Sequence, residues 1–187
     1  MKPSAPYYII SVALFCFFIF IGYAIGGIGD VAREFARGIQ TFFASINGDG
    51  SPLRVFLGIL INNEVKALGL IVFGGLFWIF PTFFTAVNGL TMGLLVRVVV
   101  ILGVPFSVFF AAILPHGILE LTGFFIATAY GFWLGTRFYE KLGRGAPFKP
   151  HIKFALLVYI KIIFPMIAVA AAIETFVTPL VIDWIKD

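Results

Sequence analysis

His116 and Glu120 stand four residues apart in a stretch of sequence that is otherwise largely apolar. Residues with this spacing lie on the same face of a helix, so an imidazole and a carboxylate would meet there. Ionisable groups inside a membrane segment are costly to keep and commonly have a function. The pair could act as a general base or bind a metal ion, or it could form a buried hydrogen bond that joins two helices. Pro115 predicts that this helix begins directly before the pair.

Glu174, at the end of the last apolar stretch, lies at a depth that matches this pair. A metal ion would then have three ligands, His116, Glu120 and Glu174, which is the minimum for a catalytic zinc-like centre. The sequence has no His-Glu-x-x-His motif, so the residues alone assign no cofactor. We predict a polar functional cluster made of Asn62, Asn63, Asn88, His116, Glu120 and Glu174.

The asparagines of this cluster have simpler interpretations as well. Asn62 and Asn63 precede a long apolar stretch, where they could cap a helix or hydrogen-bond to a neighbouring segment. Asn88 and Gly89 predict a tight turn between two apolar helices.

Arg97 falls within an apolar stretch that is predicted to cross the membrane. A lipid-facing guanidinium at that depth would be costly, so it should meet a carboxylate or extend to the interface. We predict an internal ion pair of Arg97 with Glu120 or Glu174.

The composition is that of an integral membrane protein. Of its 187 residues, 61% are hydrophobic and 12% are charged. Cys16 is the only cysteine, which excludes an intramolecular disulfide. The net charge of +4 comes mostly from short loops beside apolar stretches, so nucleic acid is not an expected partner.

Apolar stretches predict an all-α fold with about five transmembrane helices, since about 20 residues cross a hydrocarbon core. The predicted spans are residues 7–28, 65–85, 87–103, 117–138 and 154–173. Two shorter apolar pieces, residues 53–61 and 105–114, end at polar or proline-containing clusters and are predicted to be half-helices. Residues 30–46 are amphipathic and should lie along the membrane interface, before a loop at residues 47–52.

The chain is predicted to form one membrane domain, residues 1–187. Its parts are a first helix (1–29), an amphipathic segment with its loop (30–52) and a helical core (53–180). An offset of about 53 residues suggests a parallel internal repeat of 53–104 and 105–153, although coincidence in a phenylalanine-rich sequence is an equal alternative.

Basic residues crowd the stretch between the fourth and fifth spans, and they predict that this loop is cytoplasmic. They are Arg137, Lys141, Arg144, Lys149 and Lys153. Five spans then place the N-terminus in the cytoplasm and the C-terminus outside the cell membrane.

Several of these residues resemble the stage II sporulation protein M family of small polytopic membrane proteins. They are Asn62, Asn63, Asn88, Gly89, Gly93, Pro115, His116, Gly117, Glu120, Gly131, Gly135 and the run from Ile173 to Pro179. The resemblance runs from about residue 56 to residue 179. It implies a membrane component such as the namesake, which recruits cell-wall hydrolases during engulfment, while most relatives have no established activity.

The leading functional prediction is therefore a non-enzymatic membrane scaffold or assembly partner. Its expected partners are the lipid bilayer, other membrane or envelope proteins, and further copies of the chain, most simply as a dimer. Gly131 and Gly135 have the spacing of a close helix contact, either between subunits or within one. The alternatives are a small oligomeric transporter or channel, and an intramembrane metal-dependent hydrolase that uses His116 and Glu120.

Overall fold

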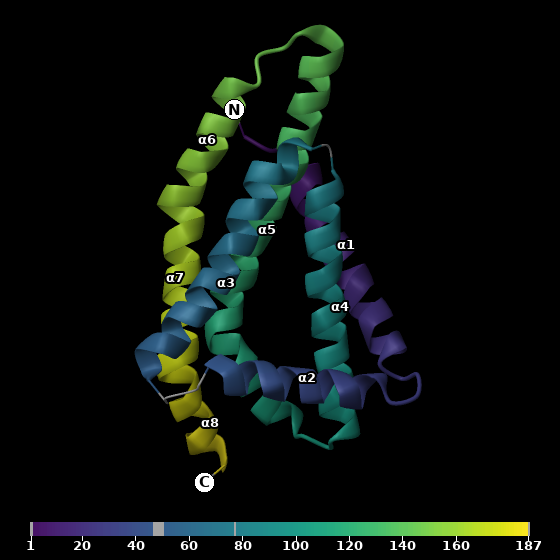
Figure 1. Ribbon diagram of the computed structural model, residues 1–187, viewed down its shortest axis with the longest axis vertical. Coiled ribbons are helices and arrows are strands. Elements are labelled where there is room, and N and C mark those ends of the chain that lie inside the picture. Colours follow the sequence, from purple (N-terminus) through teal and green to yellow (C-terminus); the bar gives the residue numbers. More distant parts are fainter. Residues whose placement is uncertain (1, 47–50, 77, 187) are drawn as a thin grey trace.

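The computed structural model describes residues 2–46, 51–76 and 78–186, apart from the side chains of residues 42–46, 185 and 186. Within these ranges all regular secondary structure is helical, which confirms the predicted all-α fold (Figure 1). The α-helices are α1 (Ala5–Ile25), α2 (Val31–Ile46), α3 (Pro52–Val72), α4 (Ile79–Ile101), α5 (Phe106–Arg144), α6 (Lys149–Val158), α7 (Phe164–Ala172) and α8 (Thr178–Lys186). A 3₁₀ turn, η1 (Phe73–Gly75), follows α3, and two π-helical segments, η2 (Tyr159–Ile163) and η3 (Ile173–Val177), join α6, α7 and α8 into one rod.

Among the described residues, five helical rods are long and apolar enough to cross a membrane, as predicted. They are Ala5–Ile25, Pro52–Gly75, Ile79–Ile101, Phe106–Arg144 and Lys149–Trp184. The chain is therefore a multi-pass membrane protein.

The rods alternate in direction along the chain (Figure 1). The N-terminus and the corner between α5 and α6 lie at one end of the molecule, and α2 and the C-terminus lie at the other. The end that faces the cytoplasm stays a prediction. The internal repeat also stays a prediction, although α3 and α5 both ascend in Figure 1 and each precedes a descending rod.

The two predicted half-helices are wrong, because each is the first part of a continuous helix. Residues 53–61 belong to α3, and residues 105–114 lead into α5 and form its first turns. Pro115 does not begin a helix but lies inside α5. Membrane helices tolerate such a proline because the surrounding protein satisfies the carbonyl that it leaves unpaired.

The predicted second span, residues 65–85, is also wrong in its bounds, because α3 ends at Val72 and α4 begins at Ile79. Pro81 then falls in the first turn of α4, a position that tolerates a missing N–H group. The predicted turn at Asn88 and Gly89 is wrong, since both residues lie within α4. Gly89 is buried against α1, and Asn88 is half-buried.

The amphipathic segment forms α2, which crosses one end of the bundle (Figure 1). Ala32 is buried and Phe35 and Ile39 are half-buried, whereas Arg33 and Arg37 are exposed. This arrangement is typical of a helix that lies along the membrane interface. The predicted loop at residues 47–52 falls largely on residues 47–50, which lie outside the described residues.

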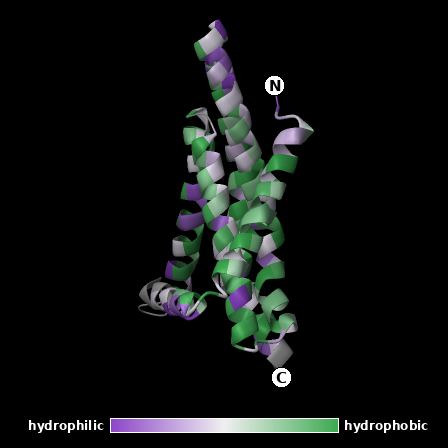
Figure 2. Cartoon of the chain, turned by 90° about the vertical axis from the view of Figure 1, so that its right-hand side faces the viewer, coloured by the Kyte–Doolittle hydropathy of each residue, from purple (hydrophilic) through white to green (hydrophobic). Residues whose placement is uncertain are grey.

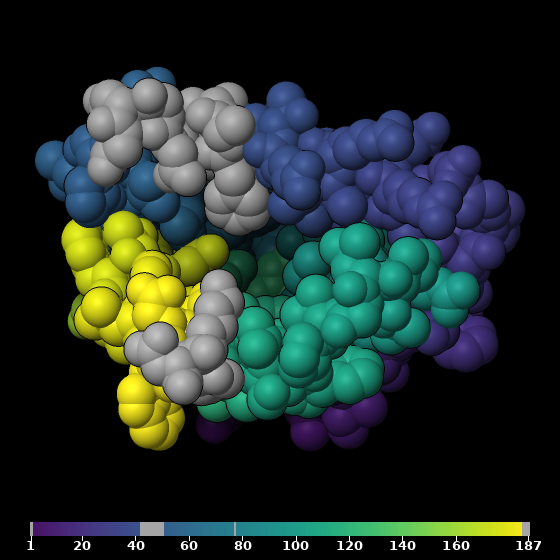
Figure 3. Space-filling view, turned by 90° about the horizontal axis from the view of Figure 1, so that it is seen from below, coloured from purple at the N-terminus to yellow at the C-terminus, as the bar shows by residue number. Residues whose placement is uncertain are grey.

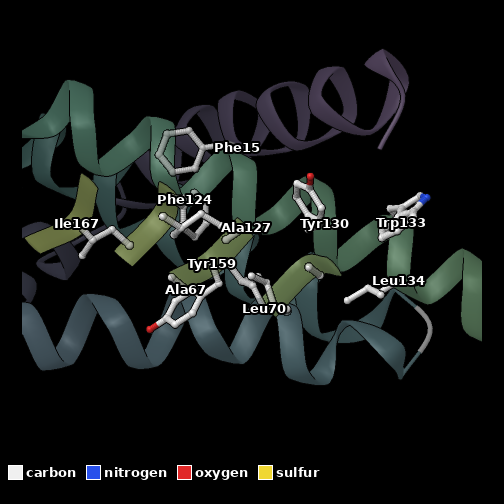
Figure 4. Close-up of a cluster of buried hydrophobic side chains, with 13 residues drawn as sticks. Phe15, Ala67, Leu70, Phe124, Ala127, Tyr130, Trp133, Leu134, Tyr159 and Ile167 are labelled. Carbon is white, nitrogen blue, oxygen red and sulfur yellow. The ribbon is translucent and has the colours of Figure 1, made fainter. Parts of the chain in front are cut away.

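The core is built around α5 (Figure 4). Phe124 and Ala127 of α5 face Ala67 and Leu70 of α3, and Phe15 covers them from α1. Tyr159, Ile163 and Ile167 close the core from the last rod. This packing fixes the rotation of α3, α5 and the last rod about their axes, and so decides which side chains face inward.

One end of α5 projects beyond the bundle. Its 39 residues make a helix of about 58 Å at about 1.5 Å per residue. That length exceeds the roughly 30 Å of a hydrocarbon core. Figure 2 shows hydrophilic residues gathered at this end, where the basic residues predicted to mark the cytoplasmic loop are found.

Candidate functional site

His116, Glu120 and Glu174 come together in one cluster. One potential ligand atom from each of the three side chains lies within 4.8 Å of the other two. His116 Nε2 is 3.8 Å from Glu174 Oε2, and their side chains are 12% and 25% exposed. His116 and Glu120 are one helical turn apart on α5, and Glu174 approaches from η3, which packs against both α5 and α3.

Thr178 completes the surroundings of His116. The distance between His116 Nδ1 and Thr178 Oγ1 is 3.3 Å, and Thr178 Oγ1 donates a hydrogen bond of 3.2 Å to the carbonyl of Ile173. That carbonyl belongs to the π-helical segment η3, where the ordinary pattern of helical hydrogen bonds is interrupted. The wider turn therefore presents Glu174 and positions Thr178 at the same time.

A cavity of about 290 Å³ adjoins the cluster within the membrane-spanning part of the bundle. Glu120 and Glu174 line one side of it, and Lys66 of α3 lies close enough to interact electrostatically with both carboxylates. Among the described residues, Lys66 makes no ion pair within 4.0 Å with either carboxylate. The charged groups are therefore separated by space that a solute or water can occupy.

The three predicted asparagines also line this cavity. Asn62 Nδ2 donates to Asn63 Oδ1 over 3.1 Å, and Asn88 Nδ2 donates to the carbonyl of Phe84 over 2.8 Å. A second cavity of about 20 Å³ shares Asn63, Asn88, Lys66 and Glu120 with the first, and is large enough for one water molecule. The asparagines supply both donors and acceptors to the cavity.

The surface of the molecule is hollowed at the end of the bundle where α2 lies (Figure 3). In the view from below, the surface is hollowed between α2 and α3 (blue), α4 and α5 (teal) and α8 (yellow) (Figure 3). These helices include three that line the cavity or carry the cluster. Phe15, Leu121 and Phe124 add apolar surface to the lining of the cavity. An apolar cavity with a few convergent polar groups is the usual form of a small-molecule site.

The predicted ion pair of Arg97 is wrong. Its guanidinium lies over the ring of Tyr23, 5.1 Å from the centroid, and Nη1 donates to the Tyr23 hydroxyl over 3.2 Å. The side chain passes close to Gly26, the C-cap residue of α1, since a Cβ atom there would lie 2.9 Å from Arg97 Cγ. The helix dipole favours a cation at this end of a helix. The rotation of α4 turns Arg97 toward α1 and away from the two glutamates.

The predicted cluster includes neither Lys66, which lines the cavity, nor Glu64, which is buried. Lys66 is three residues after Asn63 and four after Asn62, a spacing that places all three near one face of a helix. Glu64 is buried and accepts a hydrogen bond of 2.8 Å from the Tyr159 hydroxyl, while its Oε1 has no partner. Helical spacing could have identified Lys66, but nothing in the sequence pairs Glu64 with Tyr159.

The glycines predicted to make a close helix contact are used inside the subunit. A Cβ atom at Gly131 would lie 2.5 Å from the Leu70 carbonyl oxygen and 2.8 Å from Pro81. Gly135 is buried as well. The packing of Gly131 is therefore intramolecular, and the spacing of the two glycines no longer supports the predicted dimer.

Two of the comparisons with known proteins found a match: one with an uncharacterised relative and one with a family profile. The chain is 28% identical over 128 residues to an uncharacterised protein of Methanocaldococcus jannaschii, and the match covers 64% of this chain and 69% of the relative. No solved structure matches the chain significantly. The profile of the family described as "Stage II sporulation protein M" matches residues 11–179, which include every residue of the cluster and of the cavity. The chain belongs to the stage II sporulation protein M family.

Proposed function

We propose that this member of the family binds a small hydrophilic solute in the cavity and moves it across the membrane. One observation carries the proposal: a cavity of about 290 Å³ inside the membrane-spanning bundle is lined by Lys66, Glu120, Glu174 and three asparagines. A pure scaffold needs no such cavity. Ionisable groups at this depth are costly and typically mark solute or ion pathways.

The lining limits the solutes that fit. Two carboxyl groups and one lysine line the cavity, and the carboxyl groups, when ionised, favour a cation or a zwitterion with an amino group. The amides of Asn62, Asn63 and Asn88 can hydrogen-bond to either. The volume suits an ion with bound water or a small organic molecule rather than a large substrate.

Solute uptake into liposomes tests the proposal. Purified protein would be reconstituted and offered Rb⁺, Mn²⁺ or glycine, which represent a monovalent cation, a divalent cation and a zwitterion. We expect faster uptake of at least one of them than in protein-free liposomes, and loss of this uptake in the double variant Glu120→Gln, Glu174→Gln. Glu140→Gln is the matched control, because Glu140 pairs with Arg137 at the opposite end. Uptake of all three at the protein-free rate, with folded protein, would contradict the proposal.

The scaffold role is a second proposal, favoured by the projecting end of α5. Lys141, Arg144 and Lys149 are exposed there, and a basic surface outside the membrane fits an acidic protein partner. A photo-crosslinking residue at exposed Leu142 should give discrete adducts in cells, which the charge reversals Lys141→Glu and Lys149→Glu should abolish. Adducts that persist after charge reversal would argue against a partner held by this basic surface.

A further inference from the structure

We infer that His116, Glu120 and Glu174 form a binding site for a divalent transition-metal ion. The donor set is one imidazole and two carboxylates. This combination suits zinc, manganese, iron or cobalt better than it suits magnesium or calcium, which prefer ligands that are all oxygen atoms. Three protein ligands leave a coordination position open for water or a solute. The inference rests on the proposed function in one respect, because the cavity gives the ion its route to the cluster.

The hydrogen bonds around Thr178 assign the proton of His116. The Thr178 hydroxyl has one proton, and it is donated to the carbonyl of Ile173. We therefore assign Nδ1–H of His116 as the donor to Thr178 Oγ1, an assignment that leaves Nε2 with its lone pair. Metal-binding histidines are commonly held in this way, with the other ring nitrogen donating to a neighbouring oxygen.

This assignment places two acceptors opposite each other. The Nε2 lone pair and the Glu174 carboxylate are 3.8 Å apart, in surroundings where the His116 side chain is 12% exposed. Two facing acceptors repel each other unless a positive charge lies between them. A metal ion meets that need, and so does a proton carried by either His116 or Glu174.

The spacing fits a metal ion after small movements of the side chains. Bonds of about 2.0–2.2 Å place two ligands of a tetrahedral ion about 3.4 Å apart. The His116–Glu174 distance of 3.8 Å is a few tenths of an ångström longer, and the ligand atoms of all three residues are within 4.8 Å of one another. Rotation of the Glu120 carboxylate, which lines the cavity, can bring its oxygen atom to the distance that a bound ion requires.

Lys66 tunes the charge of the site. It interacts electrostatically with Glu120 and Glu174 from across the cavity, and so reduces their attraction for a second cation. Replacing Lys66 with methionine removes this competing charge without removing a metal ligand. We therefore expect Lys66→Met to strengthen metal binding several-fold.

Cobalt binding tests the inference directly. The full-length protein in detergent would be stripped with a chelator and titrated with Co²⁺, whose visible absorption reports protein ligands. We expect one Co²⁺ per chain, displaced by Zn²⁺. His116→Gln and Glu174→Gln should each weaken binding by at least about 100-fold, more than a change in the surrounding shell produces. His151→Gln is the control, because His151 lies at the basic end and bonds to the Pro147 carbonyl.

A matched pair at Thr178 keeps the test informative if a ligand variant fails to fold. Thr178→Ser retains the hydroxyl and should bind Co²⁺ as the parent does. Thr178→Val keeps the shape but removes the acceptor for His116, and should weaken binding by about 10–100-fold. Equal affinities of the two variants would show that the hydroxyl does not orient a metal-binding histidine.

The outcomes separate this inference from the proposed function. The metal site would be overturned if Co²⁺ did not bind, or if His116→Gln and Glu174→Gln left its affinity unchanged. A proton on His116 or Glu174 would then account for the contact between the two side chains. Uptake of Rb⁺ or glycine could still be observed in that case. Conversely, specific Co²⁺ binding without uptake of any solute would support the metal site and contradict transport.

Discussion

The helices pack in opposite ways in two regions of the molecule. One is the close contact between α1 and α4, and the other is the cavity beside α3. At the first, the small residues Gly22, Gly89 and Gly93 let two backbones meet, and a Cβ atom at Gly93 would clash with the Ile19 carbonyl. At the second, Asn63, Lys66 and Glu120 line about 290 Å³ of space between the helices. Small residues allow close membrane contacts because association there depends on van der Waals packing.

Small residues and ionisable residues in a membrane helix therefore predict different kinds of packing. Glycines mark where helices close on each other, and ionisable residues mark where they do not. The two regions share α1 and α4, since Phe15 of α1 and Asn88 of α4 line the cavity. The close contact between α1 and α4 can therefore form a rigid wall of the cavity.

The largest expected effect is at the closed contact. Gly93→Leu would force a side chain into the α1 backbone, so we expect the free energy of unfolding to fall by about 3 kcal/mol or more. Unfolding in mixed detergent measures this loss. Gly143→Leu is the control, because a Cβ atom at Gly143 meets nothing within 4 Å. A tolerated Gly93→Leu would mean that α1 and α4 are not in close contact.

A smaller effect is expected where a polar pair joins α3 to the last rod. Tyr159→Phe removes the only hydrogen bond to the buried Glu64 carboxylate among the described residues, and should cost about 2 kcal/mol in the same assay. Tyr139→Phe removes a hydroxyl from an exposed side chain and should have no measurable effect. Equal stability of the two variants would place Glu64 in water rather than in the core.

A still smaller effect on the free energy of unfolding is expected at the edge of the contact between α1 and α4. Tyr23→Phe keeps the ring beneath Arg97 and removes one hydrogen bond, so a loss of about 1 kcal/mol is expected. Arg97→Met, which also removes the cation, should cost more. If both variants melt as the parent does, Arg97 contributes nothing to the packing of α1.

The smallest effect is expected in the cavity. Asn63→Ala removes a polar group that borders open space, and should change the free energy of unfolding by less than about 0.5 kcal/mol. The same variant should still impair solute uptake. A large loss of stability would mean that Asn63 holds helices together, and that the polar groups are structural.

Much of the fold could be predicted from hydropathy, because five long apolar stretches can be recognised without knowledge of their tertiary contacts. The errors fall at polar residues inside those rods. Asn62, Asn63 and Asn88 were predicted to mark helix ends, as such residues do beside water, whereas they face a cavity within α3 and α4. Pro115 was assigned to a helix start for the same reason.

The grouping of His116 with Glu120 could be predicted from their helical spacing, and Glu174 from its depth. The partner of Arg97 could not, because a sequence does not give the rotation of α4 about its axis. The distance between His116 and Thr178 depends on the π-helical turn η3, which leaves no recognisable pattern in the sequence. Such details are set by the packing of whole helices.

Accessibility to water distinguishes the two regions most directly. In a Cys16→Ala background, single cysteines would be placed by Asn63→Cys in the cavity and by Ser11→Cys at a fully buried site of α1. A hydrophilic, membrane-impermeant thiol reagent would then be added to oriented membranes from each side. We expect rapid labelling at position 63 from the side of α2 and none at position 11. An unreactive cysteine at position 63 would contradict a hydrated cavity, and the proposed function with it.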